Sequence, residues 1–449
     1  MNILQRIRLP ISSGRWGAGH ENSGQRRHFQ NFVLHFRPRN VPERTLRLSL
    51  TWGLGGTAVV LVFMLFGTGL MLKFVYEPFP DRAYDSIVYL NSQVPFGQLV
   101  RNIHRWSANG LLFVVFLHFL RIFFTGAYAA PRQFNWIIGL ILLTAAILSN
   151  FTGYLLPWDQ LAYWAITIST SMLDYIPGIG AVLKEWIVGG AEPGAKTLMN
   201  FYAIHTAVLP ALLLFFLPFH FWRIRKAGGL VIPRAPGEDP SARGPMIETM
   251  PHLIVREVAM ALMVFAVILV TSMLFDAPLA DQANPGLSPN PTKAPWYFMG
   301  IQEILMHFHP VFALLVIPML VVAGLFSLPF VNKQVTTSGI WFCSRKGRKM
   351  ALAAAVISML ATVGAVLLDE FVLSTYPAGP NTLTSNGLLP FLIVLSFISA
   401  FYFLIKKGFR SSNNEAIQAL FSLVATAFVV LTIIGIWFRG PGMQLMWAG

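Results

Sequence analysis

Long apolar segments separated by short polar ones run through most of this 449-residue chain. A helix that crosses the hydrocarbon core of a membrane needs about 20 mostly apolar residues. Nine segments meet this requirement, at about 49–75, 104–126, 134–155, 200–223, 255–275, 311–330, 349–368, 388–405 and 416–437. The composition agrees, with 55% hydrophobic and 12% charged residues, and it excludes a soluble multidomain enzyme. We therefore expect an all-α polytopic membrane protein.

The distribution of basic residues predicts how the chain is oriented. With the N-terminus in the cytoplasm, the inner segments carry 25 of the 33 Lys and Arg residues and the outer segments carry eight. This is the positive-inside bias, and it explains the net charge of +14 without a nucleic-acid partner. Residues 1–48 hold nine arginines and lack the apolar core of a signal peptide. We expect a basic cytoplasmic tail on an integral protein of the bacterial inner membrane.

Four histidines lie inside the apolar segments and form two pairs with nearly equal spacing. His104 and His118 are fourteen residues apart, and His205 and His220 are fifteen apart. At about 100° and 1.5 Å per residue, each pair lies on one side of its helix, with about 21 Å between the two rings along the axis. A lone histidine in a span is more often packed or hydrogen-bonded, but two matched pairs predict two metal centres, one near each membrane face. Haem, whose iron takes axial histidines, fits this arrangement.

Glycines repeat at the same period in the first and third spans. Gly55 and Gly69 are fourteen residues apart, and so are Gly139 and Gly153. Glycine lets a bulky group approach the backbone closely, whereas ordinary small-residue helix packing would not predict the period shared with the histidines. We expect a four-helix bundle that holds two haems, with about five further transmembrane helices.

The single cysteine, Cys343, restricts which cofactors this chain holds by itself. One cysteine forms no internal disulfide, and the sequence contains neither a Cys-x-x-Cys-His motif nor a ligand set for an iron–sulfur cluster. Any such centres in the same assembly are expected on other chains.

The motifs around these residues resemble cytochrome b of the quinol-oxidising bc and bf complexes over about residues 45–335. They are Trp52-Gly-Leu-Gly-Gly56, Arg101-Asn-Ile-His-Arg-Trp-Ser107, His118-Phe-Leu-Arg121, Gly153-Tyr-Leu-Leu-Pro-Trp-Asp-Gln160 and His205-Thr-Ala-Val-Leu-Pro210. The spacing of fifteen residues between His205 and His220 resembles the bf type. A kink at Pro210 or Pro218 would accommodate the extra residue. In bf complexes the C-terminal part is a separate subunit, whereas here it is fused.

The resemblance implies that the second and fourth spans run parallel and share two non-covalent b-type haems. His104 then pairs with His205 around an outer, low-potential haem. His118 pairs with His220 around an inner, high-potential haem.

Three arginines are expected to bind the haem propionates. Arg101 and Arg105 lie about one turn from the outer ligand, and arginine makes bidentate contacts with carboxylates. Arg121 would serve the inner haem in the same way. The alternative is that these long side chains extend so that their charged groups lie at the membrane–water interface.

The resemblance also implies two quinone sites. The outer site lies between the segment at 157–159 and the one at 294–305, and its predicted residues are Tyr154, Pro157, Asp159, Ala165, Trp296, Tyr297 and Glu303. The inner site lies near His220, with Arg225, Arg256 and Glu257 as its predicted residues. An acid at a helix N-terminus, which the helix dipole favours, is an equal explanation for Glu257.

The outer site departs from the family's Pro-Glu-Trp-Tyr motif, whose glutamate takes a proton from quinol. This chain has Ala294-Pro295-Trp296-Tyr297, and proline cannot accept a proton. Glu303 follows about two turns later on the expected helix and is the predicted replacement. Asp159 is a second candidate, with His307 and His309 as weaker ones. In the competing interpretation Glu303 is a salt-bridged residue.

We divide the chain into four parts. They are the basic tail (1–48), the four-helix dihaem domain (49–230), a C-terminal quinol-site domain that resembles subunit IV of the bf complex (231–335), and additional transmembrane helices (336–449). The last part is expected to pack or to dock partner subunits.

The resemblance implies the dihaem cytochrome b subunit of a respiratory bc-type complex, a quinol:electron-acceptor oxidoreductase of the quinol–cytochrome c reductase type. Quinol is oxidised at the outer face, and electrons reach an inner quinone site through both haems, coupled to proton translocation. The implied partners are a Rieske iron–sulfur protein, c-type cytochrome subunits and the quinone pool, in a dimeric complex.

Two other functions compete. One is a non-bifurcating dihaem anchor that exchanges electrons between the quinone pool and multihaem c-type cytochromes. The other is a non-redox transporter, against which the paired histidines argue.

No haem should be covalently attached to this chain. In bf complexes a cysteine in the first span anchors an extra haem, whereas Gly53 stands at the matching place here and provides no thiol. Acid–acetone extraction of the isolated chain should therefore remove all its haem. A haem-stained band at the mass of this chain on a denaturing gel would contradict the prediction.

Overall fold

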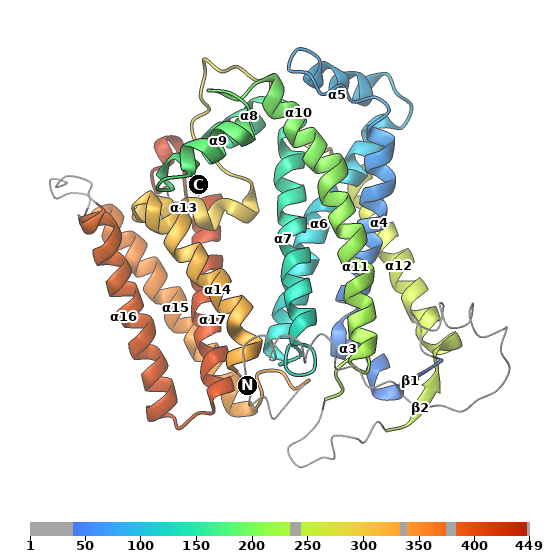
Figure 1. Cartoon of the computed structure of the whole chain (residues 1–449), viewed down its shortest axis with the longest axis vertical. Coiled ribbons are helices and arrows are strands. Elements are labelled where there is room, and N and C mark those ends of the chain that lie inside the picture. The colour runs from blue at the N-terminus through green and yellow to red at the C-terminus, as the bar shows by residue number, and fades with distance from the viewer. Residues whose placement is uncertain (1–38, 234–243, 333–338, 374–382, 447–449) are drawn as a thin grey trace.

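The protein is almost entirely helical in the part that the computed structural model describes, which is residues 39–233, 244–332, 339–373 and 383–446 (Figure 1). Nine helices of this part are long and apolar enough to cross a membrane. They coincide with the nine predicted segments, so the all-α polytopic fold is confirmed and the chain is an integral membrane protein. Residues 1–38, most of the predicted basic tail, lie outside the described residues.

The first four spans form a bundle on one side of the molecule (Figure 1). They are α4 (Leu54–Leu72), α6 (Gly97–Phe124), α7 (Gln133–Leu155), and a fourth made of α10 (Ala195–Ala203), η3 (Ile204–Val208) and α11 (Leu209–Lys226). Helix α4 packs along α6, and α7 packs along α11. Helices α6 and α11 start from the same face of the bundle and run parallel (Figure 1).

The turn η3 is π-helical and contains His205. A π-helical turn holds one residue more than an α-helical turn. Pro210 follows at once, and its missing N–H removes the α-helical bond to the carbonyl four residues earlier. The extra residue between His205 and His220 is therefore taken up by a π-helical turn, where the sequence suggested a proline kink.

Short helices cover the outer end of the bundle (Figure 1). They are α5 (Ala83–Ser92), α8 (Gln160–Ser171), η2 (Met172–Tyr175) and α9 (Gly180–Val188). Leu155, Ile166 and Leu198 are fully buried between these helices and the bundle. Burial of this apolar layer fixes the short helices over the outer histidine pair.

The C-terminal half begins with α12 (Thr249–Leu274), which packs against α4 and α6. An irregular segment leads from it to η4 (Trp296–Phe298) and α13 (Met299–His307). The remaining elements are η5 (Phe312–Val316), α14 (Ile317–Val331), α15 (Arg345–Phe371), η7 (Thr384–Leu388), α16 (Leu389–Phe403), η8 (Leu404–Gly408), α17 (Asn413–Trp437) and η9 (Pro441–Met443). Helix α17 packs along α15 and α13, and these helices form a second group beside the bundle (Figure 1).

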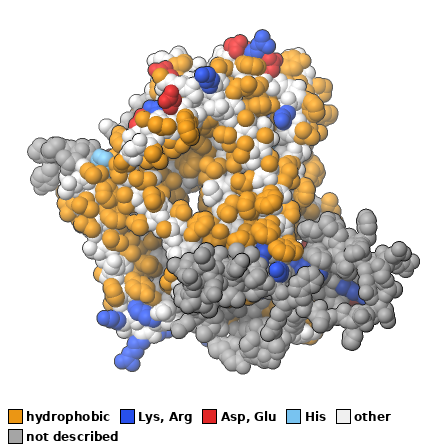
Figure 2. All heavy atoms as spheres, in the orientation of Figure 1, with side chains coloured by type: hydrophobic (Ala, Val, Ile, Leu, Met, Phe, Trp, Pro, Cys, Tyr) orange, Lys and Arg blue, Asp and Glu red, His pale blue; other side chains and the backbone are white. Residues whose placement is uncertain are grey.

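The inner end of the molecule is formed by short segments that are distant in sequence. Strand β1 (Asn40–Pro42) pairs antiparallel with β2 (Met246–Glu248), and η1 (Glu43–Leu46) and α3 (Leu48–Thr51) lead into α4. Figure 2 shows hydrophobic side chains over the middle of the visible face, acidic and basic ones near its upper end, and a group of Lys and Arg at its lower end. This is the pattern of a membrane-spanning body with one basic end, which is the end predicted to face the cytoplasm.

Candidate haem and quinone sites

The two outer histidines face each other across the bundle. The ring centroids of His104 and His205 are 6.3 Å apart. Nδ1 of His104 lies 2.9 Å from the hydroxyl of Thr68, and Nδ1 of His205 lies 3.1 Å from the hydroxyl of Thr152. With both Nδ1 atoms hydrogen-bonded, the Nε2 atoms are left as metal ligands.

The spacing of these rings suits a single metal ion between them. Metal–imidazole bonds of about 2.0–2.1 Å on both sides place the two ring centres about 6 Å apart. The described residues contain no group of three or more His, Cys, Asp or Glu side chains placed to hold a metal ion. Two protein ligands are too few for a bare ion, but they complete the coordination of an iron that a porphyrin already holds by four nitrogens. The site therefore fits axially ligated haem.

His118 and His220 form the second pair, nearer the inner end of the same two helices. The two rings lie close enough to interact electrostatically. The ring of His220 lies beside the backbone of Asn135 on α7. The structure thus brings together the same two pairs that the resemblance implies.

Each of the four predicted glycines faces a different histidine. The pairs are Gly55 with His118, Gly69 with His104, Gly139 with His220, and Gly153 with His205. A Cβ atom would lie 2.6 Å from the ring at Gly153, 3.2 Å at Gly69, and 3.6 Å at the other two. The shared period arises because the backbone of α4 and α7 lies directly against the imidazole rings.

The two outer arginines have different surroundings. Arg101 is buried, and its two Nη atoms donate to the carbonyl oxygens of Ala277 and Pro278, at 2.9 and 2.7 Å. The guanidinium of Arg105 lies 5.5 Å from the ring centroid of Tyr154 and makes no hydrogen bond or ion pair with another described residue. Arg105 is therefore the better placed of the two to receive a haem propionate.

Arg121 is buried at the inner end of α6. Its Nε donates to the carbonyl oxygen of Leu50 at 3.1 Å. Its Nη2 is buried and has no hydrogen-bond partner among the residues that the structure describes. A buried, unpaired guanidinium nitrogen is costly, so a carboxylate such as a propionate would be strongly favoured beside it.

The predicted outer quinol site brings together side chains from three regions of the chain. Trp296 donates from Nε1 to Oδ1 of Asn109 on α6, at 3.0 Å. Tyr297 is buried near Arg105 and Tyr154. Burial raises the pKa of Tyr297, so its hydroxyl stays protonated at neutral pH and is available as a donor. Pro157 lies two residues after the end of α7, and Ala165 is buried on α8.

Asp159 is used structurally at both carboxylate oxygens. Oδ1 accepts a hydrogen bond from the N–H of Ala162 at 2.9 Å and so caps α8. Oδ2 accepts from the N–H of Ala280 at 3.0 Å. These two bonds fix the loop over the outer site, and they do not favour Asp159 as a proton acceptor.

Glu303 lies on α13 with its carboxylate fully buried. Arg439 donates to it from Nη2 at 2.6 Å and from Nε at 3.1 and 3.2 Å, and Nε2 of His307 is 3.4 Å away. Burial alone would raise the pKa of Glu303, but the hydrogen bonds and charges of His307 and Arg439 outweigh it and lower the pKa. The carboxylate is salt-bridged, as in the competing interpretation, and its role as proton acceptor stays a prediction. Arg439 was missed because a lone arginine after the last span carries no periodic signal.

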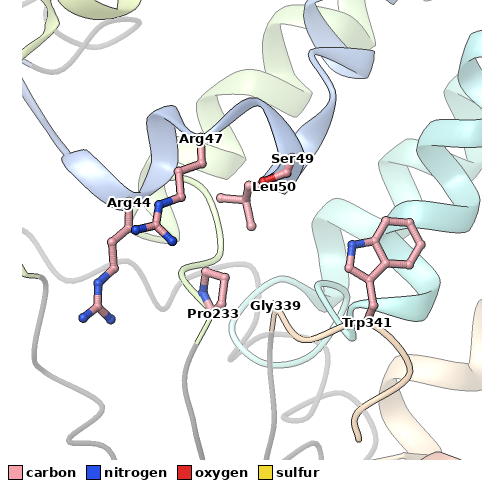
Figure 3. Close-up of a pocket in the computed structure, with 7 residues that line it drawn as sticks. All are labelled: Arg44, Arg47, Ser49, Leu50, Pro233, Gly339 and Trp341. Atoms are coloured by element: carbon pink, nitrogen blue, oxygen red, sulfur yellow. The ribbon is translucent and has the colours of Figure 1, made fainter. Parts of the chain in front are cut away.

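A cavity of about 330 Å³ opens at the inner end of the molecule (Figure 3). Its lining consists of Arg44, Arg47, Ser49, Leu50, Pro233, Gly339 and Trp341. Leu50 connects the cavity to Arg121 through the hydrogen bond described above. Sequence analysis missed this cavity because its walls come from three segments that are remote in sequence.

The three residues predicted for the inner quinone site do not line this cavity. Arg256 is exposed on α12, Glu257 is half-buried beside it, and Arg225 is half-buried at the end of α11. Their role stays a prediction.

Comparison with protein families gives a match over the N-terminal bundle. A family described as "Cytochrome b/b6/petB" matches residues 42–228. The chain is 40% identical over 181 residues to cytochrome b6 of Acaryochloris marina, which is 40% of this chain and 84% of that protein. Cytochrome b6 of Synechococcus elongatus is 38% identical over 181 residues, with the same two coverages.

A solved structure resembles nearly the whole chain. It is a chain of a "Hyperthermophilic respiratory Complex III" and has a TM-score of 0.64 at 22% sequence identity, covering 91% of this chain and 97% of that chain. At this identity the likeness concerns the fold, and it extends to helices beyond residue 228.

Replacing Gly153 with alanine should displace His205 and reduce b-haem content. The new methyl group would lie 2.6 Å from Cε1 of the ring, so the ring must move. Overpacking of this kind typically costs about 1–3 kcal/mol. The measurement is haem per protein from the reduced-minus-oxidised absorption spectrum. Gly139→Ala is the matched control, because its methyl group would lie at an ordinary 3.6 Å from His220. Equal haem loss in both variants would contradict the prediction.

Proposed function

This chain belongs to the cytochrome b/b6 family, and we propose that it is the two-haem core of a quinol-oxidising complex of the bc type. As a member of this family it binds b-type haem and takes part in electron transfer within the membrane. The observation that carries the proposal is the arrangement of four histidines as two facing pairs, each ring opposed by a glycine.

The two pairs are separated along α6 in a way that suits electron transfer across the membrane. Fourteen residues of helix correspond to about 21 Å, which is most of a hydrocarbon core about 30 Å thick. Bound haem supplies reversible one-electron chemistry at each pair. The protein's own part is to hold the imidazoles in place through Thr68 and Thr152 and to provide cations for the propionates at Arg105 and Arg121.

We assign quinol oxidation to the outer end, beside Tyr154, Trp296 and Tyr297. One electron would go to an external acceptor, either a Rieske iron–sulfur protein or a c-type cytochrome, and the other towards the inner pair. Release of both protons outside would couple the reaction to a proton gradient. The similarity in fold to a chain of a respiratory Complex III supports an assembly of this kind.

We assign the inner quinone to the cavity beside Arg121 (Figure 3). Its volume of about 330 Å³ falls within the usual range for small-molecule pockets, about 300–1,000 Å³. Trp341 offers an aromatic wall, and Arg44 and Arg47 offer donors to a quinone oxygen. The bacterial inner membrane, with the basic end of the molecule in the cytoplasm, is the proposed location.

Replacing His118 with alanine should remove the inner haem and leave the outer one largely intact. The reason is that His118 and His220 sit at one height of the bundle and His104 and His205 at the other. Redox titration of the b-haem absorption band should then show one component instead of two. Retention of both components in His118→Ala and also in His220→Ala would show that the pairing is wrong.

Replacing Glu303 with glutamine should slow quinol oxidation while both haem spectra stay normal. Removal of a general base typically slows a proton-coupled step by about a hundredfold or more. The measurement is quinol-driven reduction of the acceptor by the intact complex.

The control for Glu303→Gln is the double variant Glu303→Gln/Arg439→Gln, which avoids leaving a buried arginine without its main partner. Leaving one partner of a buried ion pair unpaired typically costs about 3–5 kcal/mol. If the double variant regains the wild-type rate, Glu303 is only the structural partner of Arg439. The non-bifurcating anchor, which needs no proton acceptor at this place, then becomes the better description.

A further inference from the structure

A cluster of five charged or titratable side chains ties α13 to the outer ends of α15 and α17. Arg439, which follows α17, binds Glu303 as described and also donates from Nη1 to Glu370 at 2.9 Å. Asp369, next to Glu370 at the end of α15, lies 2.6 Å from Nδ1 of His307. The cluster therefore joins α13, which carries the predicted proton acceptor, to the part of the chain that was expected only to pack or to dock partner subunits.

His307 connects a buried carboxylate with an exposed one. Its Nε2 is 3.4 Å from Oε1 of Glu303, whose side chain is 0% exposed. Its Nδ1 is 2.6 Å from Oδ2 of Asp369, whose side chain is 42% exposed. An imidazole bonded at both nitrogens can take a proton at one nitrogen and release it at the other. The geometry thus leads from the protein interior to the surface.

The charges around His307 allow it to change protonation state. The cluster contains three carboxylates and one guanidinium, so neutral His307 leaves an excess of negative charge, and a protonated ring reduces it. Burial by itself would lower the pKa of His307, but its bonds to Glu303 and Asp369 and their charges outweigh burial and raise the pKa. Arg439 stays charged throughout, because its own pKa is raised by Glu303 and Glu370 despite its burial.

We propose that Glu303, His307 and Asp369 form the path by which protons from quinol oxidation leave the protein at the outer face. This inference rests on the proposed function. It assigns the additional C-terminal helices a part in the reaction, because α15 supplies the exposed carboxylate at the end of the path and Arg439 holds the buried carboxylate at its start in place.

Only protons move along this path, and each step is a transfer between neighbouring atoms. A proton that reaches Oε1 of Glu303 passes to Nε2 of His307 and makes the ring cationic. The proton on Nδ1 then passes to Oδ2 of Asp369 and from there to outer water. Exchange with water, which reaches the partly exposed ring, then removes the proton from Nε2 and returns one to Nδ1, and the starting tautomer is restored. The first step requires the 3.4 Å between Nε2 and Oε1 to shorten by a few tenths of an ångström, to about 3.2 Å or less.

The test is the pH dependence of quinol oxidation by the intact complex carrying His307→Gln. In the wild type, turnover should rise as the pH passes upward through the pKa of His307, because only the neutral ring accepts a proton. In His307→Gln this rise should disappear and the maximal rate should fall about a hundredfold. Asp369→Asn should change the profile in the same sense. Added imidazole should restore part of the rate of His307→Ala, and sodium chloride of equal ionic strength should not.

Glu370→Gln is the matched control, because it removes a carboxylate of Arg439 and leaves both partners of His307. Because Glu370→Gln leaves the proposed path intact, its pH profile should keep the wild-type shape. If the cluster were only a structural clamp, Glu370→Gln would loosen it as well. If His307→Gln keeps that shape as well, or imidazole gives no rescue, the path is wrong. Failure of the proposed function would look different, since the wild-type complex itself would then oxidise no quinol.

Discussion

Two imidazole rings face each other inside an apolar bundle, at a separation that fits a single metal ion between them. The rest of the structure depends on this constraint. Centroids 6.3 Å apart require α6 and α11 to run at a fixed separation. The flanking helices α4 and α7 must then pack close to the rings, which leaves no room for a side chain. A glycine therefore faces each ring. Threonine hydroxyls satisfy the Nδ1 atoms of the outer pair, so these rings are oriented before any ligand arrives.

The irregular segment that follows α12 is held in place by residues of α6. One turn of α6 carries Arg101 and Asn102, which bind the backbone of the segment after α12, and Trp106 donates to the carbonyl oxygen of Phe275 at 2.7 Å. Asp159 holds the next residues of that segment. The loop that leads to Trp296 and Tyr297 is thus positioned by residues adjacent to a haem-ligand candidate. A shift of α6 would move the histidine and the proposed quinol site together.

Periodic features of the sequence predicted much of this structure. The nine spans follow from the length of the apolar segments, and the spacing of histidines and glycines predicted which faces of four helices meet. Features without a period could not be predicted in this way. The ion pair of Glu303 with Arg439 joins residues 136 positions apart, and the inner cavity joins three segments that are remote in sequence. The π-helical turn at Ile204–Val208 depends on which backbone hydrogen bonds form. The sequence showed only its consequence, a spacing of fifteen residues instead of fourteen between His205 and His220.

The position of Arg439 also has a consequence for biosynthesis. Membrane proteins are made and inserted from the N-terminus, so the four-helix bundle can assemble while the later helices are still being synthesised. The buried carboxylate of Glu303 on α13, in contrast, cannot meet Arg439 until the segment after α17 has been made. The four-helix bundle and the cluster around Glu303 are therefore completed at different times. A nascent chain would therefore pass through a stage with both histidine pairs formed and Glu303 still without Arg439.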